Sequence, residues 1–305
     1  LSLYEEAVSE ARDGWVRKAL LMGMDLFEEE KGSEGELIEE AVASLLAQEM
    51  PSAEIKRLYE GLGNLSKDRV LARLADGCSF ANFAGHGNPE AWLLDGDAVI
   101  TQDLLPLVIA AACSTSRFAD LDGLGEALVL DADGGAIAYL GATRVAWMGC
   151  GLLAPNILAG RMDVLLTRAF LSDLSSLGQV WARGLMDYVS EQAITRTFMV
   201  DQKPYYLSWK TVAEYGSPFG DPSLLLAKPE YPLGVLCSDA DGEAHLPGLR
   251  VVLAREGEAL SEATTDEGGK AILRALSAGN YTLSAFLQEL RVGEAELSVP
   301  CLSPF

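Results

Sequence analysis

The chain has 305 residues, 49% of them apolar, which is enough to bury a large core and rules out general disorder. Its formal net charge is −22, from 23 basic and 45 acidic residues, and a surface of this sign repels phosphate groups and anionic lipid. We therefore expect no nucleic-acid partner. The longest apolar run, 104–113, contains Pro106 and is far shorter than the roughly 20 residues of a membrane-spanning helix, so we also expect no membrane span.

The first two thirds of the chain alternate helical and strand patterns. Apolar residues among acids predict a helix at 3–12, and a short apolar strand follows at 16–24. After an acidic loop at 28–31, apolar residues recur with helical period from 37 to 46, and Ser33 with Glu36 predicts a capping box for that helix. Further predicted elements are a weak strand at 54–59, a helix at 67–74, and strands at 79–84, 107–112 and 135–140. This alternation predicts an α/β domain whose mostly parallel sheet is covered by helices on both faces.

The pattern changes after about residue 228. Segments at 249–254, 270–276, 281–287 and 294–299 alternate apolar and polar residues between Gly-rich turns. Such a series of short strands predicts a small antiparallel β-sandwich. The Pro-rich stretch from Lys228 to Pro232 marks the boundary, and we therefore divide the chain into residues 1–228 and 229–305.

Residues suited to catalysis are few. The chain has two histidines, His86 and His245, and its cysteines are widely spaced without a C-x-x-C pair: Cys78, Cys113, Cys150, Cys237 and Cys301. This spacing indicates neither a zinc site nor a disulfide scaffold. Because the number of cysteines is odd, at least one thiol must stay unpaired within the chain.

Two predicted strand ends carry complementary chemistry. His86 stands between Gly85 and Gly87 after the strand at 79–84, and Cys113 follows the strand at 107–112. The separation, 113 minus 86 or 27 residues, suits one crossover between parallel neighbours, and ligands bind at the carboxyl ends of such strands. An imidazole can activate a thiol and protonate an amine leaving group. The N–H groups of Gly87 and Cys113 would stabilise an oxyanion, and a side chain at 87 would crowd the scissile carbonyl.

Each of these residues also has a purely structural interpretation. A cysteine after an apolar strand is most often a small buried apolar residue. A histidine between glycines is also typical of a turn. Both groups together, at two strand ends of one α/β domain, favour catalysis over coincidence.

These residues resemble motifs of the gingipain family of cysteine peptidases, which belongs to the caspase-like clan. The stretch from Ala81 to Trp92 resembles the family's histidine motif, with the tryptophan six residues after His86, and Ala112 to Phe118 resembles its cysteine motif. Further motifs follow in the family's order at 124–128, 134–141, Trp147 and 219–225. The resemblance covers residues 1–228. The sandwich that follows resembles the immunoglobulin-like domain that such peptidases often carry.

The resemblance implies a cysteine endopeptidase that acts on proteins or peptides. Cys113 is then the nucleophile, His86 is the general acid and base, and the amides of Gly87 and Cys113 form the oxyanion hole. The resemblance also implies that Trp147 forms a wall of the pocket for the residue that precedes the scissile bond. The other interpretation of Trp147 is an ordinary partly buried aromatic residue.

The resemblance also bears on specificity. Arginine-type gingipains place one acid after the first strand to orient the histidine, and another before the next helix to bind a basic substrate side chain. Asp25 and Glu34 lie in the matching regions, which implies a preference for basic residues before the scissile bond. A solvated acidic loop is the other interpretation of Glu34. Lysine-type relatives carry an acid three residues after the tryptophan, and Cys150 stands there instead.

The family further implies a biological context. Relatives have an additional strand and loop before the first helix, so we expect this chain to be part of a longer secreted or cell-surface polypeptide, a zymogen matured by proteolysis. The chemistry requires no cofactor. Family relatives bind calcium, and the acidic surface is compatible with structural calcium, although the sequence has no EF-hand loop.

Two alternative functions stay open at this point. One is an inactive peptidase fold that serves in binding or adhesion. The other is a peptidyl transferase that uses the same pair of residues.

Overall fold

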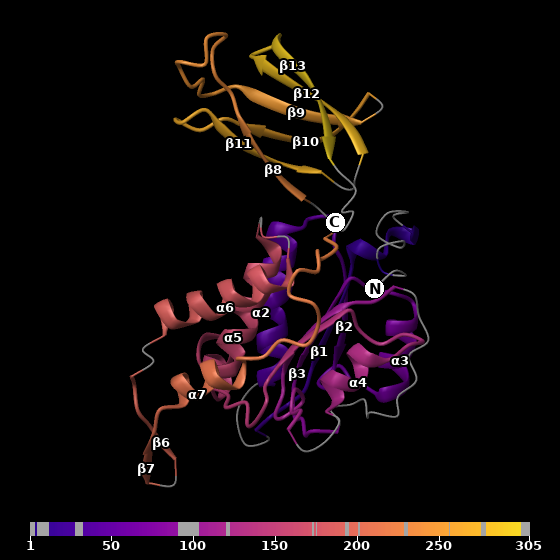
Figure 1. The fold of residues 1–305 in the computed structure, drawn as a ribbon, viewed down its shortest axis with the longest axis vertical. Helices are drawn as coiled ribbons and strands as arrows, with labels where there is room; N and C mark the ends of the chain where they lie inside the picture. Colours follow the sequence, from indigo (N-terminus) through magenta and orange to yellow (C-terminus); the bar gives the residue numbers. More distant parts are fainter. Residues whose placement is uncertain are drawn as a thin grey trace.

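The computed structural model describes residues 4, 12–27, 33–90, 104–119, 123–172, 174, 176–192, 195–200, 202–228, 231–255, 257–275 and 279–299. Figure 1 shows an α/β region, which contains a central sheet and the α-helices, and an all-β region formed by the last strands. No helix in the described part of the chain is long and apolar enough to cross a membrane.

The centre of the α/β region is a five-stranded sheet in which all neighbouring strands are parallel. Its order is β2-β1-β3-β4-β5. The strands are β1 (Lys18–Gly23), β2 (Glu54–Tyr59), β3 (Phe80–Ala84), β4 (Leu107–Ala111) and β5 (Ala138–Gly141). Strands β3 and β4 are buried along their whole length, as expected for continuous apolar segments inside a parallel sheet. The prediction that these two strands are parallel neighbours is confirmed.

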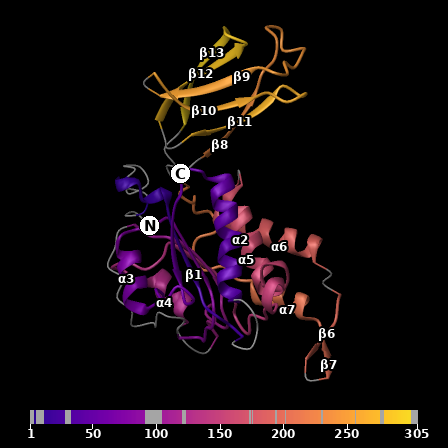
Figure 2. The same cartoon turned by 180° about the vertical axis from the view of Figure 1, so that it is seen from behind.

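Helices cover both faces of the sheet (Figures 1 and 2). One face carries α2 (Glu34–Glu49), α5 (Leu158–Leu171), α6 (Leu177–Glu191) and α7 (Leu207–Glu214), and the other carries α3 (Lys67–Ala75) and α4 (Leu124–Leu130). Alternate strand residues supply the two cores, because successive side chains of a strand point to opposite faces. Leu21 packs with the first group of helices, whereas Leu20 and Met22 pack with the second.

A buried polar cluster lies inside the first of these cores. Glu39 on α2, Asn82 on β3, and Asp163 and Thr167 on α5 are all fully buried. The Asn82 Nδ2 donates to Asp163 Oδ1 at 2.6 Å and to Thr167 Oγ1 at 3.3 Å. Burial raises the pKa of Asp163 to about 7. Burial, with a further contribution from Asp163, raises the pKa of Glu39 well above its ordinary value.

The all-β region contains two antiparallel sheets. One has the order β10-β9-β12-β13 and the other pairs β11 with β8. Its strands are β8 (Tyr231–Leu236), β9 (Arg250–Arg255), β10 (Glu258–Thr264), β11 (Lys270–Ala275), β12 (Gly279–Leu287) and β13 (Leu290–Val299). The sheets share a small core that includes Val251, Leu253, Leu273 and Tyr281. Four of these strands match the predicted segments, and β8 and β10 were not predicted.

The last residue of the α/β region before the all-β region is a buried lysine. Lys228 Nζ donates to the backbone oxygens of Ser172, at 2.7 Å, and of Leu174, just after α5, and it lies 5.5 Å from the centre of the Phe170 ring. Strand β8 begins at Tyr231. The linker expected to extend through Pro232 is therefore shorter, because the pairing of β8 with β11 already includes Pro232.

The start of α2 differs from the prediction. Ser33 is the N-cap residue, but its side chain makes no capping hydrogen bond. Glu36 Oε1 instead accepts a hydrogen bond from the Gly61 N–H at 2.6 Å. The predicted capping box is wrong, because the loop after β2 brings a backbone donor to Glu36 that the helix sequence does not reveal. The helix predicted at 3–12, except for Tyr4 and Arg12, and the acidic loop at 28–31 lie outside the described residues.

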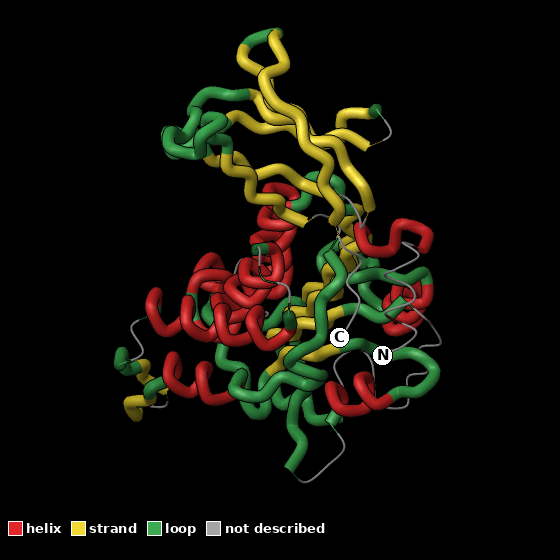
Figure 3. Tube along the Cα trace, turned by 45° about the horizontal axis from the view of Figure 1, so that its top comes forward, coloured by secondary structure: helices red, strands yellow, loops and turns green. Residues whose placement is uncertain are grey.

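Smaller elements complete the fold. The 3-10 helices η1 (Arg12–Arg17) and η2 (Gly151–Asn156) precede β1 and α5. Strands β6 (Phe198–Val200) and β7 (Lys203–Tyr205) form a hairpin before α7. In Figure 3 this hairpin extends outward beyond the helices.

Candidate functional site

Three candidate residues lie side by side at the carboxyl edge of the sheet. Asp25, His86 and Cys113 each come two residues after the end of a strand, β1, β3 and β4 in turn. Gly23 pairs with Ala84, and Ala84 pairs with Ala111. The Met24 N–H donates to the Ala84 oxygen at 3.0 Å, and the Gly85 N–H donates to the Ala111 oxygen at 3.2 Å, so the alignment continues beyond the strands. The topology therefore brings the three residues to one level of the edge where ligands bind in such sheets.

The chain turns sharply after Cys113. Ser114 has a φ of +61°, a conformation that costs a residue with a Cβ about 1–2 kcal/mol, and its N–H donates to the Arg144 oxygen at 2.6 Å. Cys113 is half-buried, with its Sγ 3.9 Å from the Ala146 oxygen. Burial raises the pKa of the Cys113 thiol. The thiol therefore stays protonated near neutral pH and needs a base to become a nucleophile.

Gly87 packs directly against the turn that contains Cys113. A Cβ at position 87 would lie 2.8 Å from Ala112 Cβ, 2.9 Å from Thr115 Cγ2 and 3.0 Å from the Cys113 oxygen. From the sequence, a glycine was expected here because a side chain would crowd the scissile carbonyl. The structure gives a different reason, because a side chain there would already collide with the protein's own cysteine turn.

Two backbone donors are available beside the thiol. The N–H groups of Gly87 and Cys113 donate no hydrogen bond to any residue that the structure describes. Backbone N–H groups in folded proteins are almost always satisfied by protein, water or ligand. These two donors can therefore serve a negatively charged oxygen at the strand ends.

His86 and Asp25 sit beside each other without a direct bond in this structure. The His86 side chain is exposed. The Asp25 N–H donates to Glu60 Oε2 at 3.0 Å, while the Asp25 Oδ1 is buried and has no hydrogen-bond partner among the described residues. Hydrogen bonds of catalytic groups often tighten only when a substrate is bound.

Glu34, at the first position of α2, is fully buried. Its Oε1 accepts from the Gly151 N–H at 2.8 Å, and its Oε2 accepts from the Leu26 N–H at 3.4 Å. The interpretation of Glu34 as part of a solvated loop is therefore wrong. Both donors are neutral, and no cationic side chain in the described part of the chain forms an ion pair with this carboxylate.

Trp147 lies on the segment that contacts Glu34. It is half-buried and its backbone oxygen accepts from the Ala159 N–H at 2.9 Å, at the start of α5. Gly151, the partner of Glu34, follows four residues later. The exposed Cys150 stands between them. The segment 147–151 thus connects Trp147 with Glu34, whereas Trp92, the other tryptophan in the motif, lies outside the described residues.

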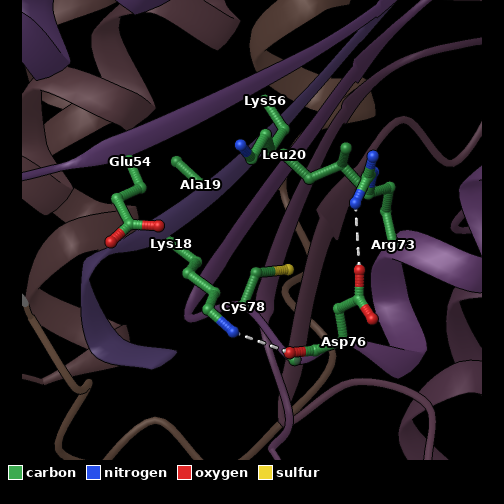
Figure 4. Close-up of a pocket in the computed structure, with 9 residues that line it drawn as sticks. Lys18, Ala19, Leu20, Glu54, Lys56, Arg73, Asp76 and Cys78 are labelled. Carbon is green, nitrogen blue, oxygen red and sulfur yellow. Dashed lines mark hydrogen bonds and ion pairs between the residues drawn. The ribbon is translucent and has the colours of Figure 1, made fainter. Parts of the chain in front are cut away.

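The other described cysteines lie in different surroundings. Cys78 is buried, which raises the pKa of its thiol to about 12, and it lines a cavity of about 220 Å³ at the opposite edge of the sheet (Figure 4). In that cavity the Lys18 Nζ donates to the Asp76 backbone oxygen, and Arg73 forms an ion pair with the Asp76 carboxylate, both at 3.0 Å. Cys237 lies in the all-β region, and its pKa is also raised by burial. In the part of the chain that the structure describes, Cys78, Cys113 and Cys237 carry free thiols.

Two acids support this edge, Glu60, which was not predicted as part of it, and Glu36, which was predicted as part of a capping box. Glu60 follows β2 and holds the Asp25 backbone, while Glu36 holds Gly61 next to it. A position directly after a strand was a usable signal for Glu60, but β2 was predicted only weakly. Among the described residues no group of three or more His, Cys, Asp or Glu side chains is arranged to hold a metal ion.

Comparison with known proteins identifies the family and the fold. The model of Peptidase family C25 matches residues 2–227. The structure of the Arg-specific cysteine proteinase gingipain R aligns with a TM-score of 0.56 and 19% identity, covering 95% of this chain and 68% of that one. The complex of the RgpB pro- and mature domains from Porphyromonas gingivalis aligns with a TM-score of 0.55 and 18% identity, covering 97% and 73%.

These structural likenesses establish a shared fold, and no curated protein sequence matches the chain significantly. The family model covers most of the chain, including the strand ends with His86 and Cys113. The chain therefore belongs to peptidase family C25, the gingipain-type cysteine peptidases.

Proposed function

We propose that this cysteine peptidase hydrolyses peptide bonds with Cys113 as nucleophile and His86 as general acid and base. The observation that carries the proposal is the alignment of Gly23, Ala84 and Ala111, which brings the following residues Asp25, His86 and Cys113 to one level. The raised pKa of Cys113 supports a role for a base, because the resting thiol keeps its proton.

The reaction proceeds through an acyl-enzyme. His86 takes the thiol proton as Cys113 Sγ forms a bond to the scissile carbonyl carbon. The tetrahedral intermediate collapses when the carbon–nitrogen bond breaks, and His86 gives its proton to the departing amine. A water molecule then attacks the thioester, and His86 takes one of its protons. The carbon–sulfur bond breaks, the acid product leaves, and His86 returns the proton to Cys113 Sγ.

Two further groups assist these steps. The N–H groups of Gly87 and Cys113, which have no other partner among the described residues, stabilise the oxyanion. Asp25 orients His86 through its buried Oδ1, which lacks a partner in the described structure. A carboxylate in this position also stabilises the imidazolium that forms during the reaction.

The pocket for the residue before the scissile bond is formed by Trp147 and Glu34. A buried carboxylate with only neutral donors is costly, and a substrate cation offsets that cost. Glu34 is such a carboxylate, held by Leu26 and Gly151. The enzyme therefore prefers a basic residue before the cleaved bond, and arginine suits the site because its guanidinium can bond both carboxylate oxygens.

The nucleophile is tested by comparing two cysteine variants on a fluorogenic arginyl peptide. Cys113→Ala abolishes hydrolysis, whereas Cys150→Ala, which removes the exposed thiol near the pocket, keeps it. Hydrolysis that persists in Cys113→Ala contradicts the assignment. If an added amine nucleophile is joined to the acyl part of the peptide, the enzyme is a transferase and not only a hydrolase. If the wild-type protein cleaves no member of a peptide library, a binding role is favoured.

The pocket is tested with two glutamates of α2. Glu34→Gln keeps the shape of the side chain but removes its charge, so it lowers the ratio of cleavage after arginine to cleavage after glutamine. Glu36→Gln is the control, since Glu36 contacts Gly61 and not the segment after Trp147. An unchanged ratio in Glu34→Gln would show that another group selects the substrate.

The remaining features of the chain are also proposals. Residues 1–228 form the peptidase domain and residues 229–305 form an immunoglobulin-like sandwich, supported by the two antiparallel sheets that begin at β8. The enzyme acts outside the cell or at its surface after proteolytic maturation, which fits its family membership. It requires no cofactor, and structural calcium is compatible with its charge of −22.

A further inference from the structure

An aromatic and basic surface lies on α7 and on the hairpin before it. Tyr206 is the N-cap residue of α7, and Trp209 and Lys210 follow three and four positions later, so the three side chains share one side of the helix. The side chains of Tyr206 and Trp209 are both 55% exposed. Large exposed aromatic residues are common at interaction sites, where tryptophan and tyrosine contribute much of the binding energy.

The hairpin extends this surface. Val200 pairs with Lys203, which is exposed. Phe198 pairs with Tyr205. Arg196 lies 5.1 Å from the Phe198 ring centre and Lys210 lies 5.6 Å from the Tyr205 ring centre, so each of the two rings has a cation over its face. Figures 1, 2 and 3 all show the hairpin extending outward from the α/β region.

The end of α7 is fixed next to the proposed catalytic edge. The Thr143 N–H donates to the Glu214 backbone oxygen at 2.9 Å, and Thr143 Oγ1 donates to the Glu214 carboxylate at 3.1 Å. The next residue, Arg144, accepts the Ser114 N–H. Tyr215 Oη donates to the Ala110 oxygen at 3.1 Å, within the strand that leads to Cys113. Helix α7 therefore connects the proposed catalytic edge, at its C-terminal end, with the surface around Tyr206, at its start.

The charge of this surface is opposite to that of the rest of the chain. Segments 143–144 and 195–215 contain four basic residues and two acidic ones, a net charge of 4 − 2 = +2, so the remaining residues carry −22 − 2 = −24. One of the two acids, Glu214, is engaged by Thr143. The basic side chains are Arg144, Arg196, Lys203 and Lys210, and all four residues are exposed. A local positive surface on an acidic protein attracts acidic partners selectively.

We propose that Tyr206, Trp209 and Lys210, together with Arg196 and Lys203, bind an acidic segment of the protein substrate that lies outside the scissile region. This inference rests on the proposed function, because it assigns a second contact to the substrate cleaved at Cys113. The cations contact the acidic side chains of the segment, and the aromatic rings pack on its apolar ones. Substrates with such a segment are selected over short peptides with the same cleavage sequence.

The test compares a short arginyl peptide with the same peptide extended at either end by alternating glutamate and phenylalanine. Lys203→Glu/Lys210→Glu lowers kcat/KM for the preferred extended peptide about tenfold and leaves the short peptide unchanged. The control Arg69→Glu/Lys270→Glu makes the same charge change at exposed positions on α3 and β11, and the advantage of the extension is kept. Trp209→Ala lowers the ratio of kcat/KM for the extended peptide to kcat/KM for the short peptide, and Trp209→Phe lowers this ratio less.

Equal kcat/KM for the short and extended peptides in the wild-type enzyme overturns the proposal but leaves the hydrolytic function intact. An equal loss on both peptides in Lys203→Glu/Lys210→Glu also overturns it. Binding is measured separately, by fluorescence anisotropy of the labelled acidic extension on Cys113→Ala. If wild-type protein hydrolyses nothing while this binding is present and is lost in Lys203→Glu/Lys210→Glu, the surface is upheld and the proposed function fails.

Discussion

Replacing Asp163 with asparagine changes how the stability of the α/β region depends on pH. Asp163 is fully buried and accepts a hydrogen bond from Asn82 at 2.6 Å. Asparagine presents an oxygen at the same place, so this bond is kept while the titratable group is removed. Its buried neighbour Glu39 also has a raised pKa, caused first by burial and then by Asp163.

The size of this change in stability with pH follows from the pKa of Asp163. Burial raises this pKa from an ordinary value of 3.8 to about 7. The folded state therefore binds a proton that the unfolded state has released between these values, and stability falls as the pH rises through that interval. A difference of about three pH units corresponds to about 4 kcal/mol, of which about 3 kcal/mol falls between pH 5 and pH 8. Above about pH 8 the contribution is constant.

The assay is urea unfolding at pH 5 and pH 8, followed by tryptophan fluorescence. All five tryptophans lie within residues 1–228: Trp15, Trp92, Trp147, Trp181 and Trp209. Between pH 5 and pH 8 the free energy of unfolding of the wild-type protein should fall by about 3 kcal/mol more than that of Asp163→Asn. Asp133→Asn, which changes an exposed acid, should behave as wild type. Identical pH dependence in wild type and Asp163→Asn would refute the reasoning, because Asp163 would then be ionised throughout.

Two further substitutions test the packing around the site and around Lys228. Gly87→Ala forces a Cβ against Ala112 and Thr115 and should cost about 1–3 kcal/mol of unfolding free energy, with a larger loss of kcat/KM than of stability, measured by urea unfolding and peptide hydrolysis. Wild-type activity in Gly87→Ala would show that the turn at Cys113 adapts freely. Lys228→Met removes the donor to the oxygens of Ser172 and Leu174 and should cost about 2–3 kcal/mol, measured against Lys56→Met at an exposed position. A loss no greater than that of the control would show that these hydrogen bonds add nothing to stability.

Much of the fold could be predicted from hydrophobic pattern alone, and the exceptions have physical causes. Strands β3 and β4 are continuous apolar segments, so their burial inside a parallel sheet follows from their sequence. Helix α5 was not predicted, because it is buried on almost all sides and therefore lacks a clear apolar stripe. Strand β8 contains Pro232 and Gly234, residues that are rare within strands and typical of linkers.

The candidate site was predictable where the backbone topology determines it. His86 and Cys113 follow two apolar strands, and their pairing places them together without help from any distant contact. The surroundings of Glu34 and Glu36 were not predictable in this way. Glu34 is buried by a contact with Gly151, 117 residues away, and Glu36 is engaged by Gly61, 25 residues away. Contacts of this range depend on how loops pack, which periodicity does not encode.

The central claim, that Cys113 is the reactive thiol, is tested most directly by locating a covalent adduct. The protein is treated with a peptide that ends in arginine chloromethyl ketone, digested, and analysed by mass spectrometry. We expect a single thioether on Cys113, none on Cys78, Cys150 or Cys237, and much slower labelling in His86→Ala. An adduct on a different cysteine that accompanies complete loss of hydrolysis would contradict the account.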